Sequence, residues 1–236
     1  PGNIGIYEIR PEHLHEVSLA ALATGMQVCP HSIGPRAVRE NLDIYERAFA
    51  DFDGSTDDVR FRVEHAELVT PEDVPRFGDL GVIPSVQPIH HTSDMEFLVQ
   101  RLGPHRAESY TSPWKSLLET GSVLAFGSDH TIYSHNPLTG FYAAITRKNE
   151  DGTPEDGYYA EQALSREEAL EGYTIGPAYA AFLEETVGSI EVGKYADLTV
   201  FDKDILSIEP VEILDTHVAF TIVDGRIVYE NTELNN

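Results

Sequence analysis

Residues 62–68 read RVEHAEL, and they are the key to the architecture of this chain. Arg62 to Glu64 have the composition of a short strand, His65 stands at its end, and a loop follows Leu68. A carboxylate beside an imidazole is unusual where a buried strand finishes. The pair indicates that this strand ends at a site rather than in a plain turn.

The same layout recurs along the chain. Short apolar runs alternate with longer helix-like stretches up to about residue 183, which is typical of repeated βα units. We expect strands at 27–30, 62–64, 82–86 and 123–126. Helices are expected at 12–24, where Gly25 stops the first one, from 35, from 70, and from 165 toward 182, where Ser165 and Glu168 form a capping box at the start.

The strand ends are evenly spaced. His65 follows His31 by 34 residues (65 − 31), and Asp129 follows His65 by 64 (129 − 65). These gaps are close to one and two units of a (β/α)₈ barrel, which uses roughly 31 residues per unit. The carboxyl ends of barrel strands converge on one mouth, so these three residues are expected to meet there.

The sequence pattern changes after about residue 187, from alternating strands and helices to strands alone. ADLTVFD (196–202), HVAFTIV (217–223) and RIVYE (226–230) read as strands, with an Asp224-Gly225 hairpin between the last two. The predicted fold is therefore α/β. Residues 1–186 form part of a (β/α)₈ TIM barrel, its last four strand-helix units, and residues 187–236 supply strands of a small C-terminal β-sandwich domain.

Four units are half of what a closed barrel needs, and an open half would expose apolar edges. Either two copies complete one another, giving a homo-oligomer, or the first half of a longer protein is missing. We favour the second reading, because the chain opens with Pro1 in a predicted loop and has no initiator Met.

Composition limits the partners. The 40 Asp and Glu residues against 16 Lys and Arg give a formal net charge of −24. Such an acidic protein repels phosphate backbones and anionic lipid, so neither nucleic acid nor a membrane is expected as a partner. The balance also fits a salt-rich habitat, although an ordinary soluble protein could share it. One cysteine, Cys29, excludes an internal disulfide framework, and we expect a cytoplasmic protein.

The candidate metal ligands are His31, His65 and Asp129. Two imidazoles and a carboxylate are a common ligand set for hydrolytic zinc, with one position left for water. The metal would activate that water as hydroxide near neutral pH, and a carboxylate could take and return the proton. Hydrogen-bonded structural histidines remain an equal alternative on spacing alone.

A series of motifs resembles a known family. The motifs are HSIGPRAV (31–38), RVEHAEL (62–68), GVIPSVQPIHHTSD (81–94), AFGSDHTI (125–132), NPLTGFYAAITR (136–147), ALEGYTIGPAYA (169–180), GSIEVGKYADLTVFD (188–202) and TIVDGRIVYE (221–230). In this order they resemble the carboxyl-terminal half of the amidohydrolase superfamily of metal-dependent hydrolases. The nearest branch is the one that contains N-substituted formamide deformylase.

The resemblance implies roles for individual residues. His31 and His65 match metal ligands after the fifth and sixth barrel strands. Asp129 matches the ligand and catalytic proton shuttle after the eighth. His90 matches a position near the substrate, where it could polarise a carbonyl as a catalytic group. Asn136 and Arg147 match positions that line or brace the loop above the substrate.

Two expected ligand groups have no counterpart here. The family's first strand supplies a His-x-His pair and its fourth a lysine, and this chain begins after both. His13 and His15 imitate the pair but fall on a predicted helix, and Pro35 replaces the usual Asp. The full-length protein would hold one or two divalent ions, zinc being the expected metal, and this chain alone could be inactive.

The resemblance implies hydrolysis of an amide- or formamide-type C–N bond, not a peptide bond, in a small-molecule substrate. Two alternatives stay open. One is a catalytically silent fragment or scaffold that keeps the hydrolase fold. The other is attack on a ring amide, a deaminated base or an ester at the same centre.

Overall fold

The computed structural model describes residues 6–235, which separate into two compact units. Unit 1 contains residues 6–86 and 97–124, and unit 2 contains residues 87–96 and 125–235. Both helices and strands occur along the chain, so the predicted mixed α/β class is confirmed. The boundary predicted at residue 186 falls inside unit 2, where helices give way to strands.

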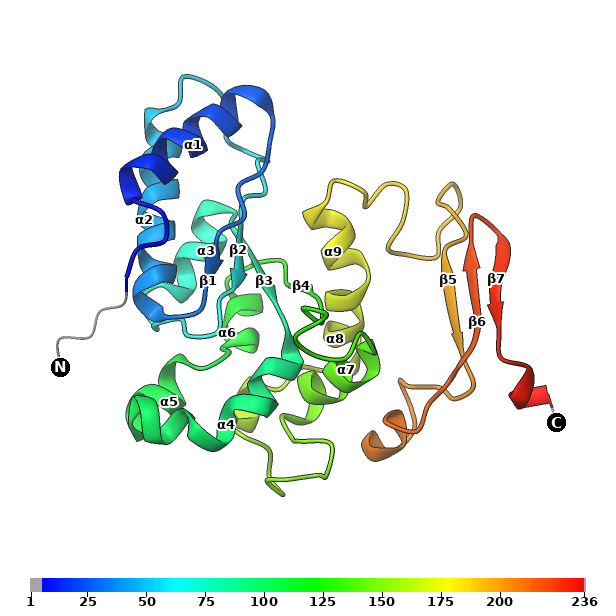
Figure 1. Cartoon of the computed structure of the whole chain (residues 1–236). Helices are drawn as coiled ribbons and strands as arrows, with labels where there is room; N and C mark the ends of the chain where they lie inside the picture. The colour runs from blue at the N-terminus through cyan, green and yellow to red at the C-terminus, as the bar shows by residue number, and fades with distance from the viewer. Residues whose placement is uncertain (1–5, 236) are drawn as a thin grey trace. The chain divides into compact units, whose positions relative to one another are not determined.

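Unit 1 is built on three parallel strands in the order β1 (His31–Ser32), β2 (Arg62–His65) and β3 (Ile83–Val86). Helix α2 (Pro35–Asp51) connects β1 to β2, and α3 (Val74–Leu80) connects β2 to β3. Parallel neighbours joined by helices are the βα units that the sequence predicts. The remaining helices of the unit are α1 (Pro11–Thr24), which lies against α2 (Figure 1), α5 (Pro104–Tyr110) and α6 (Trp114–Glu119).

The strand predicted at 27–30 is shifted, since β1 occupies only His31 and Ser32. The upstream segment nevertheless runs along β2, because the carbonyls of Val28 and Pro30 accept hydrogen bonds from the N–H groups of Arg62 and Glu64, each 3.0 Å long. Pro30 has no N–H to donate, so a full ladder does not form there.

The core of unit 1 holds these strands in place. Tyr45 and Phe61 have no exposed surface, and their rings lie 5.0 Å apart in an edge contact. The Tyr45 hydroxyl donates to the carbonyls of Val28 (3.1 Å) and Arg62 (2.9 Å). Because it bonds to the backbone of β2 and of the segment that leads into β1, this one side chain fixes their approach, and burial raises its pKa well above the usual value.

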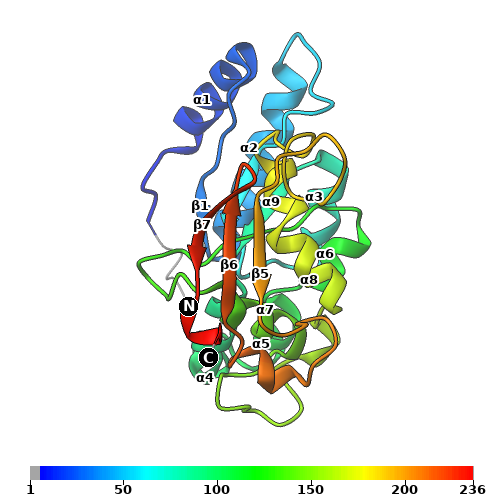
Figure 2. The ribbon, with the colours of Figure 1, turned by 90° about the vertical axis from the view of Figure 1, so that its right-hand side faces the viewer.

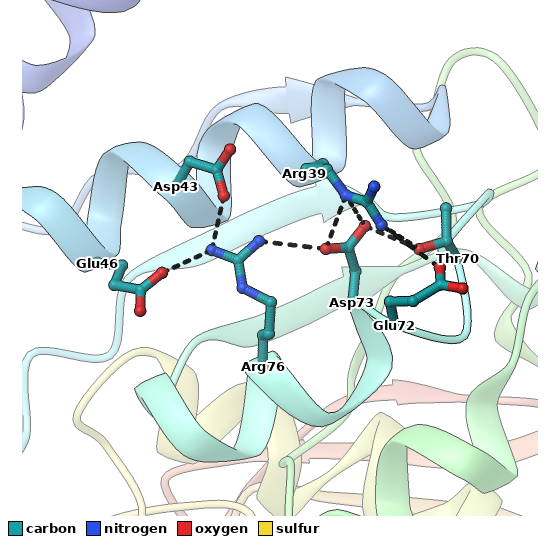
Figure 3. Close-up of polar contacts among 7 residues, drawn as sticks. All are labelled: Arg39, Asp43, Glu46, Thr70, Glu72, Asp73 and Arg76. Atoms are coloured by element: carbon teal, nitrogen blue, oxygen red, sulfur yellow. Dashed lines mark hydrogen bonds and ion pairs between the residues drawn. The ribbon is translucent and has the colours of Figure 1, made fainter.

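A charged network joins α2 to the start of α3 (Figure 3). The Asp73 carboxylate, 1% exposed, accepts from Arg39 Nε at 2.8 Å and from Arg76 Nη1 at 3.1 Å. Arg76 also pairs with Asp43 and Glu46 on α2. The helix predicted to open at Thr70 begins at Val74, because Thr70 and Asp73 form a turn whose side chains serve this network.

Unit 2 contains the rest of the secondary structure. Helix α4 (Pro88–Leu102) begins in it, with residues 88–96, and ends in unit 1. The other elements are β4 (Ala125–Phe126), α7 (Pro137–Thr146), η1 (Ala160–Gln162), α8 (Arg166–Tyr173), α9 (Ile175–Ala180), β5 (Leu198–Phe201), η2 (Pro210–Ile213), β6 (Val218–Val223), β7 (Arg226–Glu230) and η3 (Thr232–Asn235).

Helices α8 and α9 correct the prediction of one continuous helix from 165 toward 182. The expected capping box is present, with Ser165 Oγ accepting from the Glu168 N–H and the Glu168 carboxylate accepting from the Ser165 N–H. The helix stops at Thr174, whose φ of −126° and ψ of −86° are not helical. In a continuous helix the N–H of residue 177 would donate to the Tyr173 carbonyl, and Pro177 has no N–H, which favours a break here.

Strands β5, β6 and β7 form an antiparallel sheet in that order (Figure 2). The predicted hairpin is confirmed, because Asp224 and Gly225 both have positive φ, 50° and 72°, as a two-residue turn of this kind requires. Among the residues described, no helix combines the length and apolar character needed to cross a bilayer.

Candidate active site

His31 opens the two-residue strand β1, and His65 ends the neighbouring strand β2 in unit 1. Their rings lie 4.3 Å apart, centroid to centroid, in an edge-to-face arrangement. His65 is 9% exposed, whereas His31 is open to solvent. His65 has a φ of 75° and Ala66 a φ of 42°, a left-handed conformation that non-glycine residues adopt at a cost. The chain turns sharply where β2 ends and holds the two imidazoles together.

Glu64, the carboxylate beside His65, has a partner of its own. Its Oε1 accepts from Arg62 Nε at 2.9 Å, and Arg62 Nη1 also donates to Gln27 Oε1 at 3.2 Å. Glu64 pairs with His31 across the parallel ladder. Adjacent residues of a strand point to opposite faces, so Glu64 and Arg62 share a polar face of the sheet while Val63 packs in the core.

His90 and Asp129 approach each other in unit 2. His90 lies in the first turn of α4, is 6% exposed, and has its Nε2 3.8 Å from Asp129 Oδ2. Asp129 follows β4 and, like His65, has a left-handed backbone, with φ of 53°. Its carboxylate is 37% exposed, so it combines contact with an imidazole and access to solvent. Such a group can exchange protons with a small molecule.

Asn136 and Arg147 stand at opposite ends of α7. Asn136 is the N-cap, its Oδ1 accepting from the Leu138 N–H at 3.1 Å. Arg147 is the C-cap and is fully buried; its Nε donates to the Tyr158 carbonyl at 2.8 Å, and its Nη2 lies 3.4 Å from His91 Nδ1. Burial lowers the Arg147 pKa to about 9, which leaves the group cationic at neutral pH. Both residues brace α7, and their contact with substrate stays a prediction.

The buried neighbour of His90 is also structural. His91 is 3% exposed and its Nε2 lies 3.3 Å from the Tyr158 carbonyl. Burial, followed by the nearby Arg147 charge, lowers the His91 pKa well below its usual value. The ring therefore packs in neutral form.

Sequence reasoning missed two residues beside His90. The Tyr133 ring lies 4.7 Å from the His90 ring, and its hydroxyl lies 2.5 Å from Ser93 Oγ. In the sequence, Ser93 lies three residues after His90 and Tyr133 four residues after Asp129. A lone serine or tyrosine carries no distinctive spacing, so only coordinates bring them to notice.

The ligand types suit a divalent metal. Within unit 2, His90 and Asp129 are candidate ligands, and unit 1 carries the imidazole pair of His31 and His65. Imidazole nitrogen and carboxylate oxygen are donors that zinc accepts. His13 and His15 lie on α1, as predicted, and each is next to a carboxylate. His13 Nδ1 lies 3.6 Å from Glu16, and His15 Nε2 lies 3.1 Å from Asp51.

Unit 2 also contains a cavity of about 1000 Å³ bordered by α7, α8, α9 and β5. Apolar side chains such as Phe141, Tyr173 and Ile205 contribute to its wall. None of His90, Asp129, Asn136 and Arg147 lines it, so this cavity is separate from the predicted site residues of the unit.

Comparison with known proteins identifies relatives over almost the whole chain. The family model described as "Amidohydrolase family" matches residues 4–229. Protein LONG AFTER FAR-RED 3 of Arabidopsis thaliana is 34% identical over 229 residues, covering 97% of this chain and 38% of that protein. N-substituted formamide deformylase of Arthrobacter pascens is 29% identical over 230 residues, covering 98% of this chain and 41% of that protein.

A solved structure is also similar to this chain. An uncharacterized metal-dependent hydrolase from Pyrococcus horikoshii OT3 aligns with a TM-score of 0.75 and 29% identity, over 89% of this chain and 41% of that one. This chain therefore spans well under half the length of each of these three proteins.

Proposed function

Since the chain belongs to the amidohydrolase family, we propose that it contributes to a metal-dependent hydrolase acting on an amide- or formamide-type C–N bond other than a peptide bond. The observation that carries the proposal is the His31–His65 pair, two imidazoles 4.3 Å apart near the carboxyl ends of the adjacent parallel strands β1 and β2. Paired strand ends are where (β/α)₈ enzymes place their chemistry. We accordingly propose residues 1–186 as half of such a barrel and the β5–β7 sheet as part of a β-sandwich.

His31, His65 and Asp129 are the proposed ligands, and zinc is the proposed metal, with one or two ions in the full-length protein. A bound divalent ion lowers the pKa of a coordinated water toward about 7 and polarises a carbonyl. The left-handed backbone at His65 and at Asp129 supports these assignments, because strain of this kind concentrates at functional sites.

Asp129 is proposed to accept the proton of the attacking water and to return it to the leaving nitrogen. Its partly exposed carboxylate suits both steps, because it can reach water and a small substrate. His90, with its ring nitrogen 3.8 Å from that carboxylate, is proposed to orient the substrate carbonyl and steady the developing negative charge. Asn136 and Arg147 are proposed to support the substrate-binding loop from the two ends of α7.

The substrate class is proposed from chemistry and from relatives together. N-substituted formamide deformylase is among the relatives, and its name describes removal of a formyl group from a nitrogen. The acidic surface argues against a polyanionic substrate. We therefore propose a small amide or formamide, in a soluble enzyme that could assemble as a homo-oligomer.

The test uses the full-length protein. Dialysis against a chelator should abolish hydrolysis of N-substituted formamides, and added Zn²⁺ should restore it. His65→Asn should lower bound metal, measured by elemental analysis, whereas His13→Asn, an exposed histidine on α1, should leave metal and activity unchanged. Hydrolysis that survives complete metal removal would overturn the proposal, and a full-length protein without metal or activity would favour a silent scaffold.

A further inference from the structure

We propose that Tyr133 is a positioning residue which, through Ser93, sets the spacing between His90 and Asp129. The inference rests on the proposed function for the roles of His90 and Asp129. The contact itself is independent of that function, because it joins two segments of unit 2 by atoms whose distances are known.

The α4 side of the contact is firmly tied to His90. Ser93 Oγ lies 3.0 Å from the His90 carbonyl oxygen, to which it donates, and 2.5 Å from the Tyr133 hydroxyl. The Tyr133 ring lies 4.7 Å from the His90 ring at an interplanar angle of 46°. Tyr133 therefore touches His90 directly with its ring and indirectly through the serine hydroxyl. Movement of Tyr133 would disturb both contacts.

On the other side of the contact, hydrogen bonds connect Tyr133 to Asp129 within the loop after β4. The Ile132 N–H donates to the Asp129 carbonyl at 2.8 Å, and His130 Nδ1 lies 3.1 Å from the Tyr133 carbonyl. These bonds make residues 129–133 a compact turn. A shift of the phenol would therefore move the backbone that carries the Asp129 carboxylate.

The direct contact between His90 and Asp129 is too long to fix their spacing. A nitrogen and an oxygen 3.8 Å apart are beyond ordinary hydrogen-bond length, so the pair has little direct restraint on its geometry. The Tyr133–Ser93 bond, in contrast, is short. Because the phenol oxygen is already engaged with Ser93, Tyr133 is assigned to positioning rather than to proton transfer.

Two single substitutions remove the same bond from opposite ends. Tyr133→Phe keeps the ring against His90 and deletes the hydroxyl, and Ser93→Ala deletes its partner. In the full-length enzyme we expect each to lower kcat by about 10- to 100-fold, with a smaller change in KM. The double variant should be no worse than the more affected single variant, since both lose one shared interaction. Ser207→Ala, which deletes a 2.8 Å bond to Asp204 elsewhere in unit 2, is the matched control and should be unchanged.

A second readout does not depend on turnover. The side-chain resonance of His90 in protein with ¹³C-labelled histidine, assigned with His90→Asn, should shift or broaden in Tyr133→Phe and in Ser93→Ala but not in Ser207→Ala. An unchanged His90 resonance would overturn the inference, as would kcat losses that multiply in the double variant. A fall in thermal stability with both readouts unchanged would show a structural role alone. If the wild type proves inactive, the proposed function fails while the His90 resonance still tests the positioning role.

Discussion

Asp73→Asn should destabilise unit 1 far more than its size suggests. The Asp73 carboxylate is 1% exposed and accepts hydrogen bonds from Arg39, Arg76 and Thr70, at 2.8, 3.1 and 2.9 Å. Figure 3 shows it between the two guanidinium groups. An asparagine keeps one acceptor oxygen but turns an NH₂ group toward cations and removes the charge that both arginines require.

The expected cost follows from burial. Breaking a buried ion pair from one side typically costs about 3–5 kcal/mol. Arg39 is 45% exposed and Arg76 is 22% exposed, so water and the other acidic partners of Arg76 recover part of the loss. We therefore expect about 2–4 kcal/mol in the free energy of unfolding. That is a large share of the roughly 5–15 kcal/mol that stabilises a typical domain.

Urea unfolding followed by circular dichroism measures the effect. With a slope of about 2–3 kcal/mol per molar urea, the midpoint should fall by roughly 1 M without a change in slope. Asp43→Asn is the matched control, because Asp43 pairs with the same Arg76 at 2.7 Å but is 59% exposed. It should cost no more than about 1 kcal/mol. Equal midpoint shifts for the two variants would refute the reasoning that burial makes Asp73 the central acceptor.

Three further outcomes are expected. Arg147→Met should cost about 1–3 kcal/mol in thermal unfolding, because it leaves the Tyr158 carbonyl and His91 without the guanidinium donor; an unchanged Tm would contradict this. Gly140→Ala should destabilise unit 2, because the new methyl carbon would fall 1.9 Å from the Tyr173 hydroxyl. This clash should cost more than the higher helix propensity of alanine contributes, so a rise in Tm would exclude it. Raising KCl from 0.1 M to 1 M should increase Tm by several degrees, since the net charge of −24 repels itself and the screening length falls from about 10 Å to 3 Å; a Tm that falls with salt would argue against self-repulsion.

Predictions that depend on a few neighbouring residues were confirmed. Gly25 ends α1 with φ of 69°, Ser165 and Glu168 form the capping box of α8, and Asp224-Gly225 turns the last hairpin. Each motif is satisfied by hydrogen bonds or backbone angles within a few residues, so little outside the segment can change the outcome.

Predictions that depend on distant partners were less accurate. The strand expected at 27–30 appears at 31–32, because its pairing is decided by β2 and limited by Pro30. The helix expected from Thr70 begins at Val74, because Asp73 is occupied by Arg39 and Arg76 instead of capping. In both cases a tertiary contact outweighs a local preference.

The sequence by itself determined the α/β class, the family and the residue types of the candidate ligands, because apolar periodicity and motifs are properties of the chain alone. Only the tertiary structure decided that His31 and His65 meet edge to face and that Tyr133 contacts His90 with its ring and through Ser93. The physical reason is range. A contact across tens of residues depends on strand register, helix packing and burial together, and no local run of residues encodes those on its own.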